Sequence, residues 1–406
     1  ISDTWPNLAI GDIIVDPSNV NNMYVATGDS DSWFFDSYGI QVSRDGGQTW
    51  HLKNNGLQDV TQIYRLVIDP SRPHILYCAT EIGLFRSQNS GENWSKMTGI
   101  DGRINDLELH PSNPNILHVA VTKNRGWSIQ GDKNQTKSRN FDFEYYRSTD
   151  TGSSFAPINI GFESTSDESD DMLFGRIAVS PDNPNIVYIG GYANNGESLG
   201  ALYKSEDAGL TFVEKAPRST FTGTIGAWTM HLAVNPTDAD DVIMGSVTAK
   251  RSKDGGISWT SLREPELLHV DLHDMKWQPG TNRLFIANDG GLEYVNDDGI
   301  HVLTQGIRVG QFAEMSSSPH GELIIGGMQD CGTRIKLPNG RWTFVAGGDG
   351  MTGLIDPVTE RSFYASAQLG WTIKGEFSEN QLEYWDGLLF SDQEQQKATW
   401  ETLIRM

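Results

Sequence analysis

The chain has 406 residues, a formal net charge of −22, and 43 glycines and 16 prolines that are spread along its length. This excess of negative charge disfavours nucleic acids and anionic membrane surfaces as partners, because both are negatively charged themselves. No apolar run reaches the ~18 residues that a membrane-spanning helix needs, so we expect no insertion into a membrane. The scattered glycines and prolines predict many short turns rather than one disordered linker.

One eight-residue pattern, Ser-x-Asp-x-Gly-x-Thr-Trp, occurs along the chain in five variants. Their opening serines stand at positions 43, 87, 148, 205 and 252, so successive copies are 44 to 61 residues apart. The Asp side chain accepts hydrogen bonds from the following backbone, the Gly supplies positive φ, and the aromatic residue covers the sheet. A repeat of about 40–50 residues matches one four-stranded propeller blade. The pattern therefore predicts structural hairpin turns on the outer rim, away from any channel.

A second pattern places a proline turn between two short β-rich runs. It occurs eight times, at Pro17, Pro70, Pro111, Pro181, Pro236, Pro279, Pro319 and Pro357. Such a turn joins two strands, so eight turns predict eight blades. We therefore predict an all-β fold, a β-propeller of about eight four-stranded blades with residues 1–406 as one repeating domain. Ser378–Asp386 is the one segment predicted to form a short helix.

Together with these repeats, several segments resemble the sortilin-like (Asp-box/BNR repeat) β-propellers. The resemblance is strongest to large secreted proteins that Bacteroidetes-type bacteria export by the type nine secretion system. It is carried by Ile10–Pro17, Ala26–Asp31, His269–His273, Asn288–Gly291, Gly326–Thr333 and Gly347–Gly350. Cys331 departs from it, because these proteins usually have Asn there.

This resemblance implies an extracellular or cell-surface protein. It also implies that the chain is a fragment of a larger secreted polypeptide, whose other domains or surface assembly would be partners. The blades would then be either a closed eight-bladed ring or part of a ring of about ten. The sequence leaves both arrangements open.

The segment His269-x-Asp271-x-His273 is the candidate metal site. Alternate residues of a strand point to the same face, so a strand here would bring two imidazoles and one carboxylate together. That set can hold zinc or calcium, and the sequence indicates no other cofactor. The alternative is a polar inner strand whose side chains hydrogen-bond to neighbouring blades or to water in the channel.

Two long insertions are candidates for recognition. Gly28–Tyr38 carries aromatic residues among carboxylates, a composition suited to stacking on a sugar or gripping a peptide. Lys123–Phe143 adds an aromatic residue within a basic patch. The predicted binding residues are Trp33, Phe34, Phe35, Tyr38 and Trp127. The alternative is that these aromatic side chains only cover the face of the propeller.

Enzymatic activity is harder to place in the sequence. A glycosidase needs two carboxylates across a cleft, one of them with a raised pKa. The loop carboxylates available for this are Asp29, Asp31, Asp330 and Asp349, and no pattern pairs them. The sequence therefore favours a protein- or glycan-binding scaffold module without catalytic residues. The alternative is a glycoside hydrolase, a xyloglucanase-type endo-glycanase that acts on polysaccharide.

Overall fold

The computed structural model describes residues 5–6, 9–28, 35–124, 141–162, 172–193, 199–221, 230–262, 269–303, 312–368, 371–378 and 381–385. These residues form eight four-stranded antiparallel sheets, in which each strand pairs with the next one along the chain. The predicted all-β propeller of four-stranded blades is confirmed. The described part of the chain contains no helix long and apolar enough to cross a membrane.

The first four sheets contain β1 (Ile10–Val15), β2 (Met23–Thr27), β3 (Ile40–Ser43), β4 (His51–Leu52); β5 (Ile63–Ile68), β6 (Leu76–Thr80), β7 (Gly83–Ser87), β8 (Ser95–Lys96); β9 (Arg103–Leu109), β10 (Leu117–Asn124), β11 (Phe141–Ser148), β12 (Ala156–Ile158); and β13 (Met172–Val179), β14 (Val187–Ala193), β15 (Leu199–Ser205), β16 (Val213–Phe221). The last four contain β17 (His231–Asn235), β18 (Asp238–Gly245), β19 (Ala249–Ser252), β20 (Thr260–Ser261); β21 (Leu272–Trp277), β22 (Leu284–Asn288), β23 (Gly291–Asn296), β24 (Gly299–Val302); β25 (Phe312–Ser317), β26 (Ile324–Met328), β27 (Gly332–Lys336), β28 (Trp342–Ala346); and β29 (Gly350–Ile355), β30 (Ser362–Ala367), β31 (Thr372–Ser378), β32 (Gln381–Trp385).

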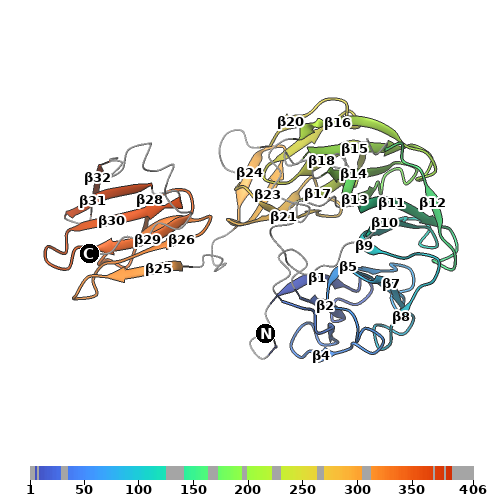
Figure 1. Ribbon diagram of the computed structural model, residues 1–406, viewed down its shortest axis with the longest axis horizontal. Helices are drawn as coiled ribbons and strands as arrows, with labels where there is room; N and C mark the ends of the chain where they lie inside the picture. The colour runs from blue at the N-terminus through green and yellow to red at the C-terminus, as the bar shows by residue number, and fades with distance from the viewer. Residues whose placement is uncertain are drawn as a thin grey trace. The chain divides into compact units, whose positions relative to one another are not determined.

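The chain divides into two compact units. Unit 1 comprises Ile1–Ile286 and Tyr294–Ile300, and unit 2 comprises Ala287–Glu293 and His301–Met406. Within unit 1 the first strands of successive sheets contact one another, from β1 and β5 through to β17 and β21, and they lie on the inner side of the unit (Figure 1). Within unit 2, β25 and β26 contact β29. That residues 1–406 form a single domain stays a prediction.

The eight proline turns connect the first and second strands of their sheets, as predicted. In the first sheet, the Asp16 carboxylate accepts the Ser18 N–H at 2.8 Å and the Asn22 side-chain amide at 2.9 Å. These bonds hold the turn between β1 and β2 closed, because an Asp side chain can take the place of a backbone acceptor. The same place in the following sheets holds the other seven prolines.

The five octets connect the third and fourth strands, so the prediction of hairpin turns is confirmed. In each octet the Gly N–H donates to the hydroxyl of the opening Ser at 2.8–2.9 Å. In the first octet the Thr49 hydroxyl donates to the Asp45 carboxylate at 2.6 Å, and the Thr49 N–H donates at 2.9 Å. These bonds from Thr49, with that from Ser43, lower the pKa of Asp45 to about 2. The octet Asp therefore works as a turn staple.

The hydrophobic core lies between successive sheets. Middle strands are buried on both faces, as β6 illustrates. Leu76 and Cys78 pack in one cluster with residues of the first sheet, while Tyr77 and Ala79 pack in another with residues of the third. Alternate residues of a strand face opposite sides, so one apolar strand joins two sheet interfaces.

The predicted helix at Ser378–Asp386 is wrong. Ser378 ends β31 and Gln381–Trp385 forms β32, with Phe377 paired to Leu382 and Ser378 to Gln381. A short segment has little intrinsic helical stability. Pairing with the neighbouring strand therefore decides its conformation.

Candidate functional site

The order of the strands gives every sheet two ends with different connections. In a four-stranded antiparallel meander, the connections between strands one and two and between strands three and four lie at one end. The connection between strands two and three, and the link to the next sheet, lie at the other end, which we call the loop end. The proline turns and octets occupy the first end. Among the described residues, the predicted positions Phe35, Tyr38, His269, Asp271, Asp330 and Asp349 lie at the loop ends of their sheets.

The first aromatic loop is described from Phe35 onward, at the loop end of the first sheet. Phe35 is 54% exposed, and Tyr38 is partly buried. The Ser37 N–H donates to the Thr61 carbonyl at 2.7 Å, and the Tyr38 N–H donates to the Thr27 hydroxyl at 3.2 Å. This part of the loop is thus anchored, with Phe35 presented to solvent. Trp33, Phe34 and Trp127 lie outside the described residues, so their binding role stays a prediction.

The expectation that His269, Asp271 and His273 share one face of a strand is wrong. Strand β21 begins at Leu272, so only His273 belongs to it. Asp271 has a φ of 60°, a left-handed conformation that interrupts the alternation of side chains along a strand. Only His273 lines the cavity described below. Metal binding by these residues stays a prediction.

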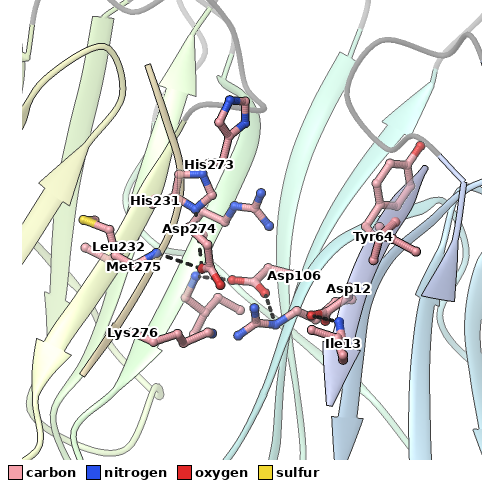
Figure 2. Close-up of a pocket in the computed structure, with 15 residues that line it drawn as sticks. Asp12, Ile13, Tyr64, Asp106, His231, Leu232, His273, Asp274, Met275 and Lys276 are labelled. Atoms are coloured by element: carbon pink, nitrogen blue, oxygen red, sulfur yellow. Dashed lines mark hydrogen bonds and ion pairs between the residues drawn. The ribbon is translucent and has the colours of Figure 1, made fainter. Parts of the chain in front are cut away.

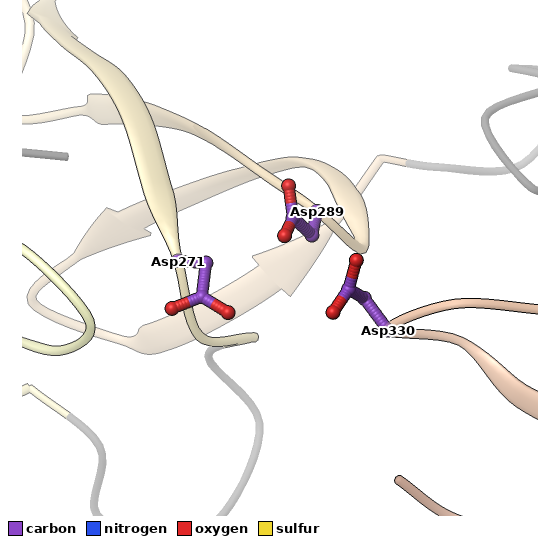
Figure 3. Close-up of side chains that lie close together, drawn as sticks. All are labelled: Asp271, Asp289 and Asp330. Carbon is purple, nitrogen blue, oxygen red and sulfur yellow. The ribbon is translucent and has the colours of Figure 1, made fainter. Parts of the chain in front are cut away.

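Three loop-end aspartates are drawn in Figure 3. Asp271 directly precedes β21, Asp289 directly follows β22, and Asp330 lies between β26 and β27 (Figure 3). Within unit 2, the backbone N–H of Asp330 donates to the Asp349 carboxylate at 3.0 Å. The N–H of Asp349 in turn donates to the Gln368 side-chain carbonyl at 2.8 Å. The carboxylate of Asp349, one of the candidates from the sequence, therefore supports the backbone of Asp330, another of them.

A polar cavity of about 400 Å³ lies between the first strands of unit 1 (Figure 2). One strand position supplies much of its lining, namely the residue five positions before each turn proline. In unit 1 this position is occupied by Asp12, Arg65, Asp106, Arg176, His231 and Asp274, and all six line the cavity. We call them the channel residues. Acidic and basic side chains alternate over the first four sheets.

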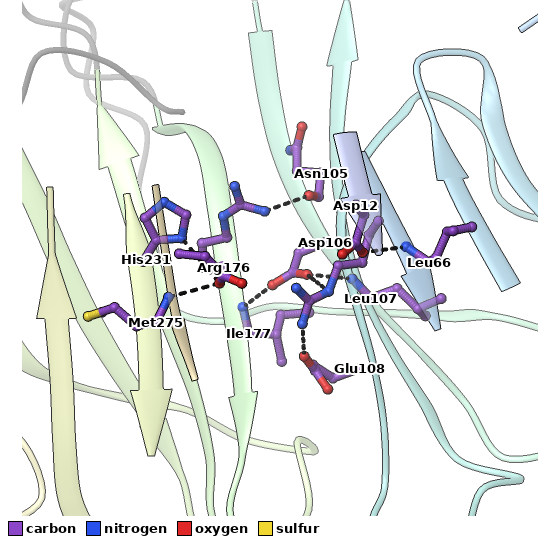
Figure 4. Close-up of polar contacts among 12 residues, drawn as sticks. Asp12, Leu66, Asn105, Asp106, Leu107, Glu108, Arg176, Ile177, His231 and Met275 are labelled. Carbon is purple, nitrogen blue, oxygen red and sulfur yellow. Dashed lines mark hydrogen bonds and ion pairs between the residues drawn. The ribbon is translucent and has the colours of Figure 1, made fainter. Parts of the chain in front are cut away.

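The channel residues bond each sheet to the next (Figure 4). Asp12 accepts the Leu66 N–H from the second sheet at 2.7 Å. Asp106 repeats this contact one pair of sheets later, accepting the Ile177 N–H at 2.8 Å. Each of these two carboxylates thus accepts a backbone hydrogen bond from the first strand of the next sheet.

Arg65 and Arg176 complete the network. Arg65 approaches Asp106 at 3.4 Å and Glu108 at 2.6 Å. Arg176 donates to the carbonyls of Met230 at 3.0 Å and Asn105 at 3.3 Å. Because the carboxylates of Asp12 and Asp106 are engaged with backbone amides, this arrangement supports strands rather than offering an acid–base pair.

Burial has the largest effect on the pKa values of several channel residues. It raises the pKa of Asp12, although Arg65 opposes this effect. Burial lowers the pKa of His231 to about 3, and the nearby charge of Arg176 adds to the shift. Burial also opposes the charge on Arg65, but Asp106 and Glu108 outweigh it and raise the pKa of Arg65. Near neutral pH the channel therefore contains a charged Arg65 and a neutral His231.

These channel residues were missed in the sequence, although a signal was present. Each stands five positions before the proline of its turn. Aligning the eight proline turns would have shown the polar position. A single polar residue in an apolar strand attracts no notice when each repeat is considered alone.

The chain matches the model of one repeat family and is similar to several known proteins. The family model of the BNR/Asp-box repeat matches residues 41–52. The xyloglucanase of Hypocrea jecorina (strain QM6a) is 27% identical over 168 residues, covering 39% of this chain and 18% of that protein. A xyloglucanase of a Paenibacillus species is 23% identical over 287 residues, covering 64% and 27%. Xyloglucanase Xgh74A of Acetivibrio thermocellus is 26% identical over 310 residues, covering 68% and 36%.

Solved structures support the fold. The GH74 enzyme of Niastella koreensis has a TM-score of 0.51 and 15% identity, covering 93% of this chain and 65% of that enzyme. An ancestral GH74 enzyme has a TM-score of 0.51 and 13% identity, covering 93% and 62%. The chain spans between 18% and 36% of the length of the three curated relatives. The repeats and sheets together define a β-propeller that carries the BNR/Asp-box repeat.

Proposed function

We propose that this chain is the propeller part of a glycoside hydrolase that acts on a β-glucan such as xyloglucan. The similarity to xyloglucanases, which for one relative extends over 68% of this chain, carries the proposal. It favours the hydrolase over the scaffold module that the sequence by itself favoured. An extracellular location, which the resemblance to exported propellers implies, suits a hydrolase that acts on such a polymer.

The structure supports Asp330 as a reacting carboxylate. It lies at a loop end, in a three-residue connection between β26 and β27, and is partly exposed. Its φ of 59° is left-handed, a conformation that is uncommon for residues with a side chain and is concentrated at functional sites. Glycoside hydrolysis uses a pair of carboxylates. Of the other loop candidates from the sequence, Asp349 is buried beside the Asp330 backbone, and Asp29 and Asp31 lie outside the described residues.

The test is turnover of xyloglucan, measured as the release of reducing ends. We expect Asp330→Asn to lower kcat by at least about a hundredfold, because an amide cannot exchange the proton that the reaction needs. Asp182→Asn is the matched control, since Asp182 is exposed in the turn between β13 and β14. Asp29→Asn and Asp31→Asn are measured alongside.

The scaffold function predicts a different result. The protein would retain xyloglucan without cleaving it, and Phe35→Ala, which removes an exposed aromatic side chain, would weaken retention. Absence of reducing ends together with such retention would reject the hydrolase. Turnover that survives Asp330→Asn would reject the role of Asp330.

A further inference from the structure

We propose that Asp349 is a positioning residue that holds the loop carrying Asp330 in its observed conformation. It acts through the backbone of that loop, not on a substrate. This inference rests on the proposed function, because it concerns the carboxylate assigned there to the reaction. Asp349 lies in the link between β28 and β29, whereas Asp330 follows β26, so the contact joins the last two sheets.

The first observation is the bond itself. The Asp330 N–H donates to the Asp349 Oδ1 atom at 3.0 Å. Asp349 is only 8% exposed, so its carboxylate is withheld from a polymeric substrate. A buried carboxylate must be satisfied by donors, and the Asp330 amide is one of them. The bond therefore holds the backbone of Asp330, the residue with the left-handed φ.

The second observation is the support behind Asp349. Its own N–H donates to Gln368 Oε1 at 2.8 Å. The preceding residue, Gly348, has a φ of +73°, and a Cβ there would stand 2.7 Å from the same oxygen. Only glycine allows this approach without displacing Gln368. The relay Gln368–Asp349–Asp330 therefore runs from the last sheet to the loop.

Position matters because reactivity depends steeply on geometry. A displacement of about 1 Å in a reacting group can cost about a hundredfold in rate. The connection between β26 and β27 is three residues long, and its middle residue carries the proposed reacting group. Losing the bond to Asp349 removes one of the contacts that hold that middle residue.

The experiment compares Asp349→Ala with Asp349→Asn. Asparagine keeps an oxygen that can accept the Asp330 N–H, whereas alanine removes it. Two experiments are made: hydrogen exchange of peptides spanning Ile324–Lys336, and steady-state kinetics on xyloglucan, which give kcat and KM. We expect Asp349→Ala to speed exchange at this loop roughly tenfold, as loss of one hydrogen bond implies. We expect kcat to fall about tenfold or more with KM nearly unchanged, and Asp349→Asn to stay near the unsubstituted protein in both.

Other results overturn the proposal in distinguishable ways. Unchanged exchange in Asp349→Ala would show that Asp349 does not hold the loop. Faster exchange with unchanged kcat would show that holding the loop is irrelevant to the reaction. If Asp349→Asn is inactive although its loop stays protected from exchange, the reaction needs the negative charge of Asp349, and the positioning role is wrong. If the unsubstituted protein does not cleave xyloglucan, the proposed function fails, and with it the catalytic part of this inference, while exchange still decides the structural part.

Discussion

At the level of single residues, the tryptophan side chains of the octets differ in how far they are buried. Trp50 and Trp259, the aromatic residues of the first and fifth octets, are only partly buried. Trp94, in the second octet, is 4% exposed and belongs to the core cluster between the first two sheets. The difference depends on what packs against each octet, which the octet itself does not encode.

We therefore expect Trp94→Ala to destabilise the protein by about 3–5 kcal/mol, the usual cost of removing a large buried side chain. Trp50→Ala should cost clearly less, because part of the Trp50 side chain already meets water. Chemical denaturation with both variants measures the two costs. Equal costs would contradict the role assigned to burial.

His231 gives the channel a pH dependence. Its Nδ1 atom lies 4.0 Å from the Asp274 carboxylate, and the charges of Arg176, His273 and Lys276 also act on it. Burial lowers its pKa in the folded chain to about 3, below the ordinary value of about 6.5. As pH falls below about 6.5, the unfolded chain takes up a proton here and the folded chain does not. The contribution of His231 to stability is therefore full above that pH and declines as pH falls toward 3.

We expect His231→Gln to weaken the decline in the free energy of unfolding between pH 7.5 and pH 5. Denaturant midpoints over this range provide the measurement. His74→Gln is the control, because His74 is exposed in the turn between β5 and β6. A decline as steep in His231→Gln as in the unsubstituted protein would exclude His231 as its source.

At the level of elements, the first strands of unit 1 are joined by side chains as well as by apolar packing. Arg65, whose side chain is 19% exposed, faces two carboxylates of the third sheet. Removing one partner of a buried ion pair leaves an uncompensated charge, which is far more costly than replacing the whole pair.

Arg65→Met should therefore destabilise the protein by roughly 3–5 kcal/mol. Lys253→Met, which removes the same charge from an exposed octet position, should change stability by less than about 0.5 kcal/mol. A double variant, Arg65→Met with Asp106→Asn, should recover part of the loss if the unpaired carboxylate is its cause. Additive losses in the double variant would argue against a coupled pair.

At the level of the whole molecule, contacts are concentrated within two units. Repeat architectures are stabilised mainly by neighbouring repeats, so cooperativity follows the contact density. We expect calorimetry to show two unfolding transitions. Trp94→Ala should shift the transition of unit 1. Phe363→Ala, which alters a buried residue of unit 2, should shift the other transition. A single transition shifted by both variants would instead support one cooperative domain.

The sequence by itself determined the local features of this protein. Octets and proline turns specify their own hydrogen bonds within a few residues, so blade number and strand connections followed directly from the repeats. Burial of Trp94, the strand at Gln381–Trp385, the break in alternation at Asp271 and the bond between Asp330 and Asp349 were decided only by the tertiary structure. The physical reason is that each depends on a neighbouring strand or sheet: its packing, its pairing, or the backbone and side-chain groups that it places beside the residue.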